Sequence, residues 1–164
     1  MKWDYSFDIV VIGSGNAALT SALCNYEMGT KNILVVEKTE QYGGTSAIGG
    51  GGVWIPCNHY ALAAGAEDSL EDALSYLKAT TPEGAVDESM QRTFLDNGPK
   101  MLRFLHEKTD VRYVSLGEYP DYYSDAPGAR LGHRSVEPET IDITELQADG
   151  DLLRGSHYMM HILG

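Results

Sequence analysis

A short turn near the start of the chain has the residue types and spacing that bind a nucleotide. Residues 13–18 read Gly-Ser-Gly-Asn-Ala-Ala, the G-x-G-x-x-G/A pattern with alanine in the third place. Gly13 would allow the tight turn, Gly15 would let the backbone approach a pyrophosphate, and Ala18 would let a helix pack on a strand. A helix that begins here would offer free amides and its positive dipole end to phosphate. The expected contacts are Gly13, Ser14, Gly15, Ala17 and Ala18.

A carboxylate follows at the distance expected for the ribose of the same nucleotide. Glu37 lies 22 residues after Gly15, at the end of a second apolar run. It would accept hydrogen bonds from the ribose diol, and its charge disfavours a 2′-phosphate. The alternative is a strand-helix-strand unit that binds no nucleotide.

The elements that position these residues read as α/β. Residues 9–12 and 33–36 are β-branched runs typical of strands buried on both faces of a parallel sheet. Residues 16–28 read as a helix that packs through Ala17, Ala18, Leu19, Ala22 and Leu23 and ends at Gly29. Further on we expect a helix over 69–79 with a Ser69–Asp72 capping box. A second helix is expected around 90–94, interrupted at Gly98-Pro99 and resumed over 100–108. A strand over 111–116 and a long ordered loop over 117–138 would follow.

Composition excludes several classes of function. The chain has 164 residues, 24 acidic and 12 basic, and a formal net charge of -12. This balance argues against nucleic-acid binding, which needs a basic face. No apolar run is long enough for a membrane helix, and no secretory signal is visible, so we expect a cytoplasmic protein. Cys24 and Cys57 read as free thiols, and His157 and His161 lack a third metal ligand, so we expect no metal.

Glycine is concentrated in a second block after the strand-helix-strand unit. Nine of the 18 glycines fall between Gly13 and Gly52. A flat, bulky ring needs backbone rather than side chains at close range, and glycine provides it. A flexible linker is the alternative, but Thr45, Ser46, Ile48 and Trp54 are interleaved with the glycines.

This second block resembles the flavin-contacting segment of the fumarate reductase and succinate dehydrogenase flavoprotein family. The resemblance rests on Glu37-Lys38, on residues 43–47 and on residues 49–52. It implies FAD as the cofactor, with backbone beside the pyrophosphate and the isoalloxazine ring. The residues that it adds to the expected FAD site are Lys38, Gly43, Gly44, Thr45, Ser46, Ala47, Gly50 and Gly51.

A narrower resemblance covers residues 7–145. The segments at 50–56, 119–123, 127–129 and 132–138 are similar to bacterial 3-ketosteroid dehydrogenases, most of all 3-oxosteroid 1-dehydrogenases. This implies C1–C2 desaturation of a 3-ketosteroid, with hydride transfer to flavin N5 and an external electron acceptor. Dehydrogenation at the 4-position stays open. Tyr122 matches an active-site tyrosine that supports a base tyrosine from a later segment. Loop packing is its alternative role, and we expect Arg134 to hold the loop together by hydrogen bonds.

The resemblance and the strand count together predict an incomplete fold. We expect an α/β, Rossmann-like FAD/NAD(P)-binding fold with a helical insertion, in which residues 1–154 form the N-terminal part of an FAD-binding domain and residues 155–164 an atypical or truncated tail. Few strand-like runs follow residue 36, so the chain would be a fragment that is inactive alone. Two rivals remain: a fumarate reductase-like flavoprotein, and a truncated chain without catalysis.

Overall fold

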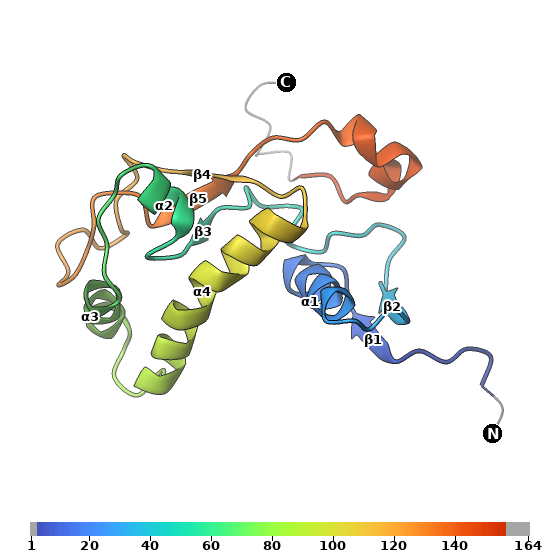
Figure 1. The fold of residues 1–164 in the computed structure, drawn as a ribbon, viewed down its shortest axis with the longest axis horizontal. Helices are drawn as coiled ribbons and strands as arrows, with labels where there is room; N and C mark the ends of the chain where they lie inside the picture. Colours follow the sequence, from blue (N-terminus) through green and yellow to red (C-terminus); the bar gives the residue numbers. More distant parts are fainter. Residues whose placement is uncertain (1–2, 157–164) are drawn as a thin grey trace. The chain divides into compact units, whose positions relative to one another are not determined.

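The chain forms two compact units, which are described one at a time. A computed structural model describes residues 3–156 (Figure 1). The first unit comprises residues 1–51 and 141–164, and the second comprises residues 52–140. The elements of the first unit are β1 (Ile9–Ile12), α1 (Asn16–Glu27), β2 (Ile33–Val36) and the 3₁₀ segment η1 (Ile143–Leu152). Those of the second are β3 (Val53–Trp54), α2 (His59–Ala63), α3 (Leu70–Thr80), α4 (Glu88–Lys108), β4 (Tyr113–Ser115) and β5 (Ser135–Pro138).

The first unit contains the predicted strand-helix-strand motif. β1 and β2 pair in parallel, in a register that runs from Ile9 opposite Ile33 to Ile12 opposite Val36. α1 connects them and contacts both strands (Figure 1). Gly29 has a φ of +108°, a conformation that L side chains rarely adopt, directly after the helix. The local pattern of apolar residues and glycines therefore predicted this motif correctly.

The prediction that these two strands are buried on both faces is wrong for the described residues. Val11 is buried, whereas Val10 is 53% exposed and Ile12 is 85% exposed. No residue of α1 is buried either, although its apolar positions were expected to pack. Within residues 3–156 this sheet has two strands. One helix can cover only one face of a two-stranded sheet, and the sheet covers only one side of the helix. The remaining faces of both are therefore exposed.

The second unit is built on an antiparallel sheet in the order β3-β5-β4. The central strand β5 lies in the segment predicted to be a long loop, so that part of the prediction is wrong. Val136 in β5 is fully buried and packs with Ile55 and Leu102 in one core cluster. A second cluster joins α3 to α4 through Ala73, Leu74 and Leu95. The predicted strand over 111–116 is confirmed in shorter form as β4.

α4 is one continuous helix through Gly98 and Pro99, which corrects the predicted interruption. An interior proline costs about 3 kcal/mol. Leu95 before it and Leu102 after it are both buried, so packing on the two sides of the proline outweighs that cost. Gly98 is buried as well, and a Cβ there would lie 3.1 Å from Ile55. Glycine is thus needed for close helix packing and does not break the helix.

α3 begins as predicted, with half of the expected capping box. The amide of Asp72 donates to Ser69 Oγ over 3.1 Å. The reciprocal bond is replaced, because the amide of Ser69 donates to Asp68 over 2.9 Å while the Asp72 carboxylate accepts from Arg130. Cys24 and Cys57 are both free, as expected. Within residues 3–156 no helix combines the length and apolar character needed to cross a bilayer.

Candidate functional site

A groove of about 900 Å³ lies over the carboxyl ends of β1 and β2 and the start of α1. Ten of the predicted cofactor residues line it: Gly13, Ser14, Gly15, Ala17, Ala18, Glu37, Lys38, Gly44, Thr45 and Ser46. The other four, Gly43, Ala47, Gly50 and Gly51, do not. The lining residues that the sequence did not single out are Val11, Ile12, Asn16, Ser21, Val36 and Arg154. Residues from four separate segments thus converge on one concave surface.

The turn between β1 and α1 depends on its two glycines. Gly13 has a φ of +98°, and its amide donates to the carbonyl of Val36 over 2.7 Å, which ties the turn to the end of β2. Gly15 is the N-cap residue of α1, with no side chain to cap the helix. The first amides of a helix have no acceptor within the helix, so this turn directs hydrogen-bond donors to the groove.

Ser14 joins three of the segments that build the groove. Its side chain is buried, and its Oγ donates to Glu37 Oε2 over 2.5 Å. The same hydroxyl accepts from the amide of Gly43 over 3.0 Å. Ser14 therefore braces the ends of the two strands against the second glycine block, and its hydroxyl is engaged by the protein itself. The serine in the turn was predicted as a ligand, but the brace could not be predicted from its position.

Glu37 is ionised and retains acceptor capacity. Its Oε1 accepts from the amides of Lys38 and Thr39 over 2.8 and 3.2 Å. The hydrogen bond from Ser14 is the largest of the effects that together hold the pKa of the Glu37 carboxyl below its ordinary value. A carboxylate offers about four lone-pair positions. Oε2 accepts a single hydrogen bond among the described residues, so it can accept a hydroxyl of a bound ligand.

The second glycine block lies directly against the first. A Cβ on Gly44 would lie 3.5 Å from Gly15 Cα, and the amide of Asn16 donates to Ser46 Oγ over 3.1 Å. Gly43 has a φ of +105°, and a Cβ there would lie 2.7 Å from the side chain of Ala47. The two blocks are separated by 30 positions in the chain between Asn16 and Ser46. Their contact is the feature of the site that periodicity and motif spacing alone do not reveal.

These groups fit the ADP part of a dinucleotide. The start of α1 presents amides and a positive dipole end, which suit a pyrophosphate. Gly15 and Gly44 leave the backbone bare where the two blocks meet, so a phosphate can approach it closely. The free acceptor capacity of Glu37 suits a ribose hydroxyl. The first unit thus offers a donor surface for phosphate and an acceptor for sugar in one groove.

The predicted tyrosine loop belongs to the second unit. Tyr122 is 88% exposed, and its ring lies 5.3 Å from that of Tyr123. The amide of Tyr123 donates to the hydroxyl of Tyr76 over 3.1 Å, which fixes the backbone beside the exposed ring. The side chain of Tyr122 is exposed, and the backbone beside it is held by its neighbours, so its active-site role and the loop-packing alternative both stay predictions.

A buried ion network holds this loop. Arg134 donates two hydrogen bonds to Asp68 over 3.0 and 2.7 Å and a third to Asp121 over 2.7 Å. Asp121 also accepts from the indole of Trp54 over 2.7 Å. Burial alone would raise the pKa of the Asp68 carboxyl, but hydrogen bonds and charge from Arg134 outweigh it, so this pKa lies below its ordinary value. The prediction that Arg134 ties the loop together is confirmed.

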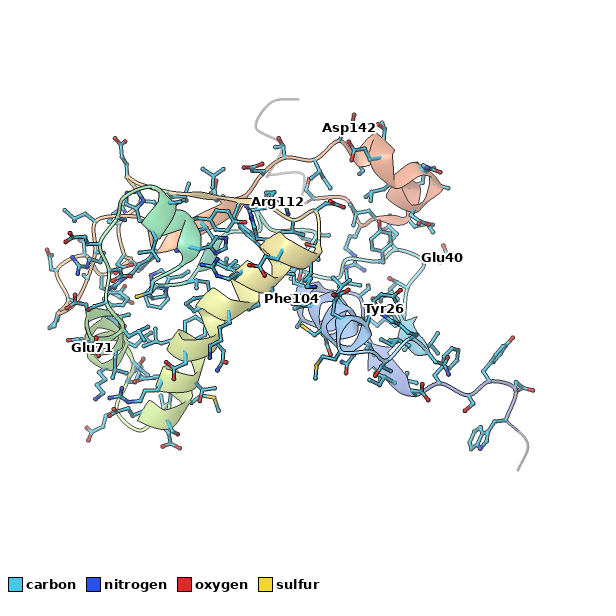
Figure 2. The ribbon with its side chains drawn as sticks, viewed as in Figure 1. Tyr26, Glu40, Glu71, Phe104, Arg112 and Asp142 are labelled. Carbon is cyan, nitrogen blue, oxygen red and sulfur yellow. The ribbon has the colours of Figure 1, made fainter. Side chains whose placement is uncertain are left out.

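A smaller hollow of about 280 Å³ lies beside α4, where Figure 2 labels Phe104. His59 lines it, and burial lowers the pKa of its imidazole, which is therefore neutral at pH 7. Burial, assisted by Asp68, raises the pKa of the Cys57 thiol to about 11. A protonated thiol is a poor nucleophile, so this hollow lacks an activated group. Residues 3–156 contain no cluster of metal-binding side chains, and the predicted pair His157 and His161 lies outside them.

Comparison with known proteins identifies the type of fold. Residues 8–159 match the model of the FAD binding domain family. The chain is 42% identical over 144 residues, or 88% of its length, to 4-oxocyclohexanecarboxylate 2-dehydrogenase of Sinomonas cyclohexanicum. It is 41% identical over 143 residues, or 87%, to 3-oxosteroid 1-dehydrogenase of Mycobacterium tuberculosis. In both cases it spans 25% of the relative.

A solved structure gives the same answer for the fold. The 3-ketosteroid delta1-dehydrogenase of Sterolibacterium denitrificans, in complex with 1,4-androstadiene-3,17-dione, matches with a TM-score of 0.86 and 38% identity. The match covers 92% of this chain and 26% of that one. The fold is an FAD-binding fold, and the cofactor of the family is FAD. Because the family model matches nearly the whole chain, this protein belongs to the FAD binding domain family.

Proposed function

We propose that this chain supplies the nucleotide-binding part of an FAD-dependent dehydrogenase that desaturates a 3-ketosteroid at C1–C2. The observation that carries the proposal is the contact between the two glycine blocks, where Asn16 bonds to Ser46 and Gly44 lies against Gly15. This contact supports a backbone-lined site of the kind that a pyrophosphate requires. The relatives that act on ring ketones supply the reaction class.

The proposal includes the architecture that the resemblance implied. β1, α1 and β2 would be the first part of a Rossmann-like sheet, and the parallel pairing of Ile9 with Ile33 supports this. Residues 1–154 would form the N-terminal part of the FAD-binding domain, with residues 155–164 as its atypical tail. The protein would act in the cytoplasm and pass its electrons to an external acceptor.

The proposal gives each of the expected cofactor residues a role in holding FAD. Gly15 and the amides of Ala17 and Ala18 at the start of α1 would bind the pyrophosphate. Gly13 would shape the turn, because its own amide is bonded to Val36. Glu37 would accept the hydroxyls of the adenosine ribose through Oε2. The second block would continue beside the pyrophosphate and the ring. Its members are Lys38, Gly43, Gly44, Thr45, Ser46, Ala47, Gly50 and Gly51. Ser14 would act chiefly as a brace, because its hydroxyl is already bonded on both sides.

The chemistry is removal of a proton and a hydride from neighbouring carbons. FAD, when bound, supplies the acceptor for the hydride. The ring ketone acidifies the adjacent C–H, so a base can take that proton. Tyr122 would donate a hydrogen bond that supports this base, and its exposure of 88% within the described residues leaves its hydroxyl accessible for this role. Trp54, Asp121 and Arg134 would position it by fixing the loop.

A second substrate class has specific support. The relative from Sinomonas cyclohexanicum is named for 4-oxocyclohexanecarboxylate, which carries a ketone on a six-membered ring as the steroid A-ring does. The reaction beside the ketone would be the same, while the carboxylate would need a cation or donor to bind it. The two substrates therefore differ in what holds the ring and not in the bond that is oxidised.

The test has two stages. The full-length protein is purified and its visible spectrum is recorded, and flavin absorption that stays with the protein on gel filtration is the expected result. Turnover is then measured with an artificial electron acceptor on 4-androstene-3,17-dione, on 4-oxocyclohexanecarboxylate and on fumarate with a reduced dye. Steroid turnover supports the proposal, and cyclohexane turnover alone supports the second class. Fumarate reduction, or a protein that takes up no FAD, contradicts both.

A further inference from the structure

Arg154 is the cation in the nucleotide groove that no motif predicted. It lies just after η1 and lines the groove together with the glycine turn and Glu37. Resting on the proposed function, we infer that Arg154 is a phosphate ligand, which binds the pyrophosphate of FAD through its guanidinium group. The inference adds a residue to the FAD site from a segment more than a hundred positions away.

The backbone of Arg154 is held in place beside the second glycine block. Its amide donates to the carbonyl of Tyr42 over 2.9 Å, and the amide of Tyr42 donates to Leu152 over 2.9 Å. Tyr42 and Leu153 form an isolated parallel bridge between these bonds. The Leu153 side chain would lie 3.1 Å from a Cβ on Gly43, so the two segments are in close contact. This clamp fixes the point from which the Arg154 side chain extends.

The guanidinium of Arg154 has hydrogen-bonding capacity that the described part of the chain does not use. Nε is buried and has no hydrogen-bond partner within residues 3–156. Nη2 makes one long hydrogen bond, 3.5 Å, to Thr39 Oγ1. A guanidinium carries five N–H donors in a rigid fork, and buried donors are nearly always paired. An unpaired Nε beside a groove therefore indicates an acceptor that belongs to a ligand.

The chemistry of the groove specifies what that acceptor is. Of its lining side chains, Arg154 and Lys38 are cations and Glu37 is the anion. No ion pair between Arg154 and Glu37 occurs among the described residues, so Glu37 does not neutralise the charge of the guanidinium group. A planar fork matches two oxygens of a phosphate better than it matches a ribose or a base. The pyrophosphate of FAD is the anion that the proposed function brings to this groove.

The experiment compares Arg154→Gln and Arg154→Lys with Arg103→Gln as the matched control. Arg103 is exposed on α4 and does not line the groove. The substitution Arg103→Gln therefore removes the same charge at a site away from the nucleotide. The apoprotein is titrated with FAD by flavin fluorescence, and with ADP and adenosine by calorimetry. We expect Arg154→Gln to weaken FAD and ADP about 10- to 100-fold and to leave adenosine unchanged. Arg154→Lys should lie between, because it keeps the charge and loses the fork.

Thermal melts of the apoprotein separate ligand binding from a structural role. We expect Arg154→Gln to melt within about 2 °C of the wild type without FAD, while FAD raises its melting temperature less. The inference is overturned if Arg154→Gln binds FAD and ADP as tightly as the wild type does. It is also overturned if the affinity for adenosine falls as much as the affinity for ADP, or if the apoprotein loses much of its stability. Competition by inorganic phosphate as strong as that by ADP would instead show a free-anion site. If the wild type binds no FAD, the proposed function fails first, and this inference fails with it.

Discussion

Arg134 and Asp121 form an ion pair 2.7 Å long in which both side chains are 2% exposed. Breaking a buried pair by removing one partner costs about 3–5 kcal/mol, because it leaves a buried charge without compensation. We therefore expect Arg134→Met, which keeps most of the volume, to lower the free energy of unfolding by about that amount. Urea denaturation measures it. Arg103→Met is the control. If both substitutions lower the free energy of unfolding by the same small amount, the buried ion network does not stabilise the fold.

The same network predicts a pH dependence. The folded pKa of Asp68 lies below its ordinary value because Arg134 outweighs burial. A depressed pKa stabilises the fold above the unfolded pKa of about 3.9, and this contribution is lost as the pH falls through the folded value. In Arg134→Met the charge of Asp68 becomes unfavourable, so the loss of stability should be smaller at pH 4 than at pH 7. Melting temperatures of the wild type and Arg134→Met between pH 4 and pH 7 measure this loss. If their difference does not change with pH, Arg134 is not what lowers the pKa of Asp68.

Glu37 should control FAD affinity through its Oε2. Glu37→Gln keeps the shape and loses the charge, while Glu37→Ala also removes the acceptor from Ser14. We expect FAD affinity to fall about 10-fold in Glu37→Gln and further in Glu37→Ala, since each hydrogen bond to a charged group contributes about 1.5–3 kcal/mol. Fluorescence titration measures both. Glu40→Gln is a nearby control, and unchanged affinity in Glu37→Ala would remove the carboxylate from the site.

Tyr122 should matter to turnover and not to stability. Its ring is 88% exposed, so Tyr122→Phe should leave the melting temperature within about 1 °C. Loss of a hydroxyl that supports the base should lower turnover of a 3-ketosteroid by at least about 10-fold. Tyr123→Phe is the matched control, because it alters the adjacent ring in the same way. Equal turnover in the two variants would assign Tyr122 to packing.

Gly128 is a position where the backbone forbids a side chain. Its φ is +75°, and a Cβ would lie 2.1 Å from the carbonyl oxygen of Asp72. Gly84 has a φ of +74° with open space around it, so it isolates the backbone effect. We expect Gly84→Ala to cost about 1–2 kcal/mol and Gly128→Ala clearly more, because the loop must move. Chemical denaturation compares them, and equal losses would show that the loop yields freely.

The features that the sequence predicted are local ones. The turn at Gly13, the helix after it and the cap at Ser69 depend on residues within a few positions of each other. Packing between distant segments decided the features that were missed. β5 is four residues long with the sequence Ser-Val-Glu-Pro, and it becomes a strand because Val136 fills a core between β3 and β4. α4 continues through Pro99 because Leu95 and Leu102 are buried on either side.

The site divides in the same way. Motif spacing predicted the first glycine block and Glu37, while the family resemblance added Lys38 and the second block. Ten of these residues line the groove. The brace through Ser14 and the clamp that brings Arg154 to Tyr42 were not predictable, because no local pattern marks a pair of residues that meet only after folding. The unpaired Nε of Arg154 depends on which residues surround it after folding, and no sequence pattern marks it.

The bond between Tyr42 and Arg154 also sets an order of events during synthesis. One wall of the groove comes from a segment made only after the whole second unit, residues 52–140, has been translated. At about 5–20 residues per second, roughly 5–20 s pass between the synthesis of the strand-helix-strand motif and the synthesis of the segment that contains Arg154. During this interval FAD cannot yet meet Arg154. Cofactor capture that uses Arg154 should therefore come late, after residues 52–140 have been synthesised.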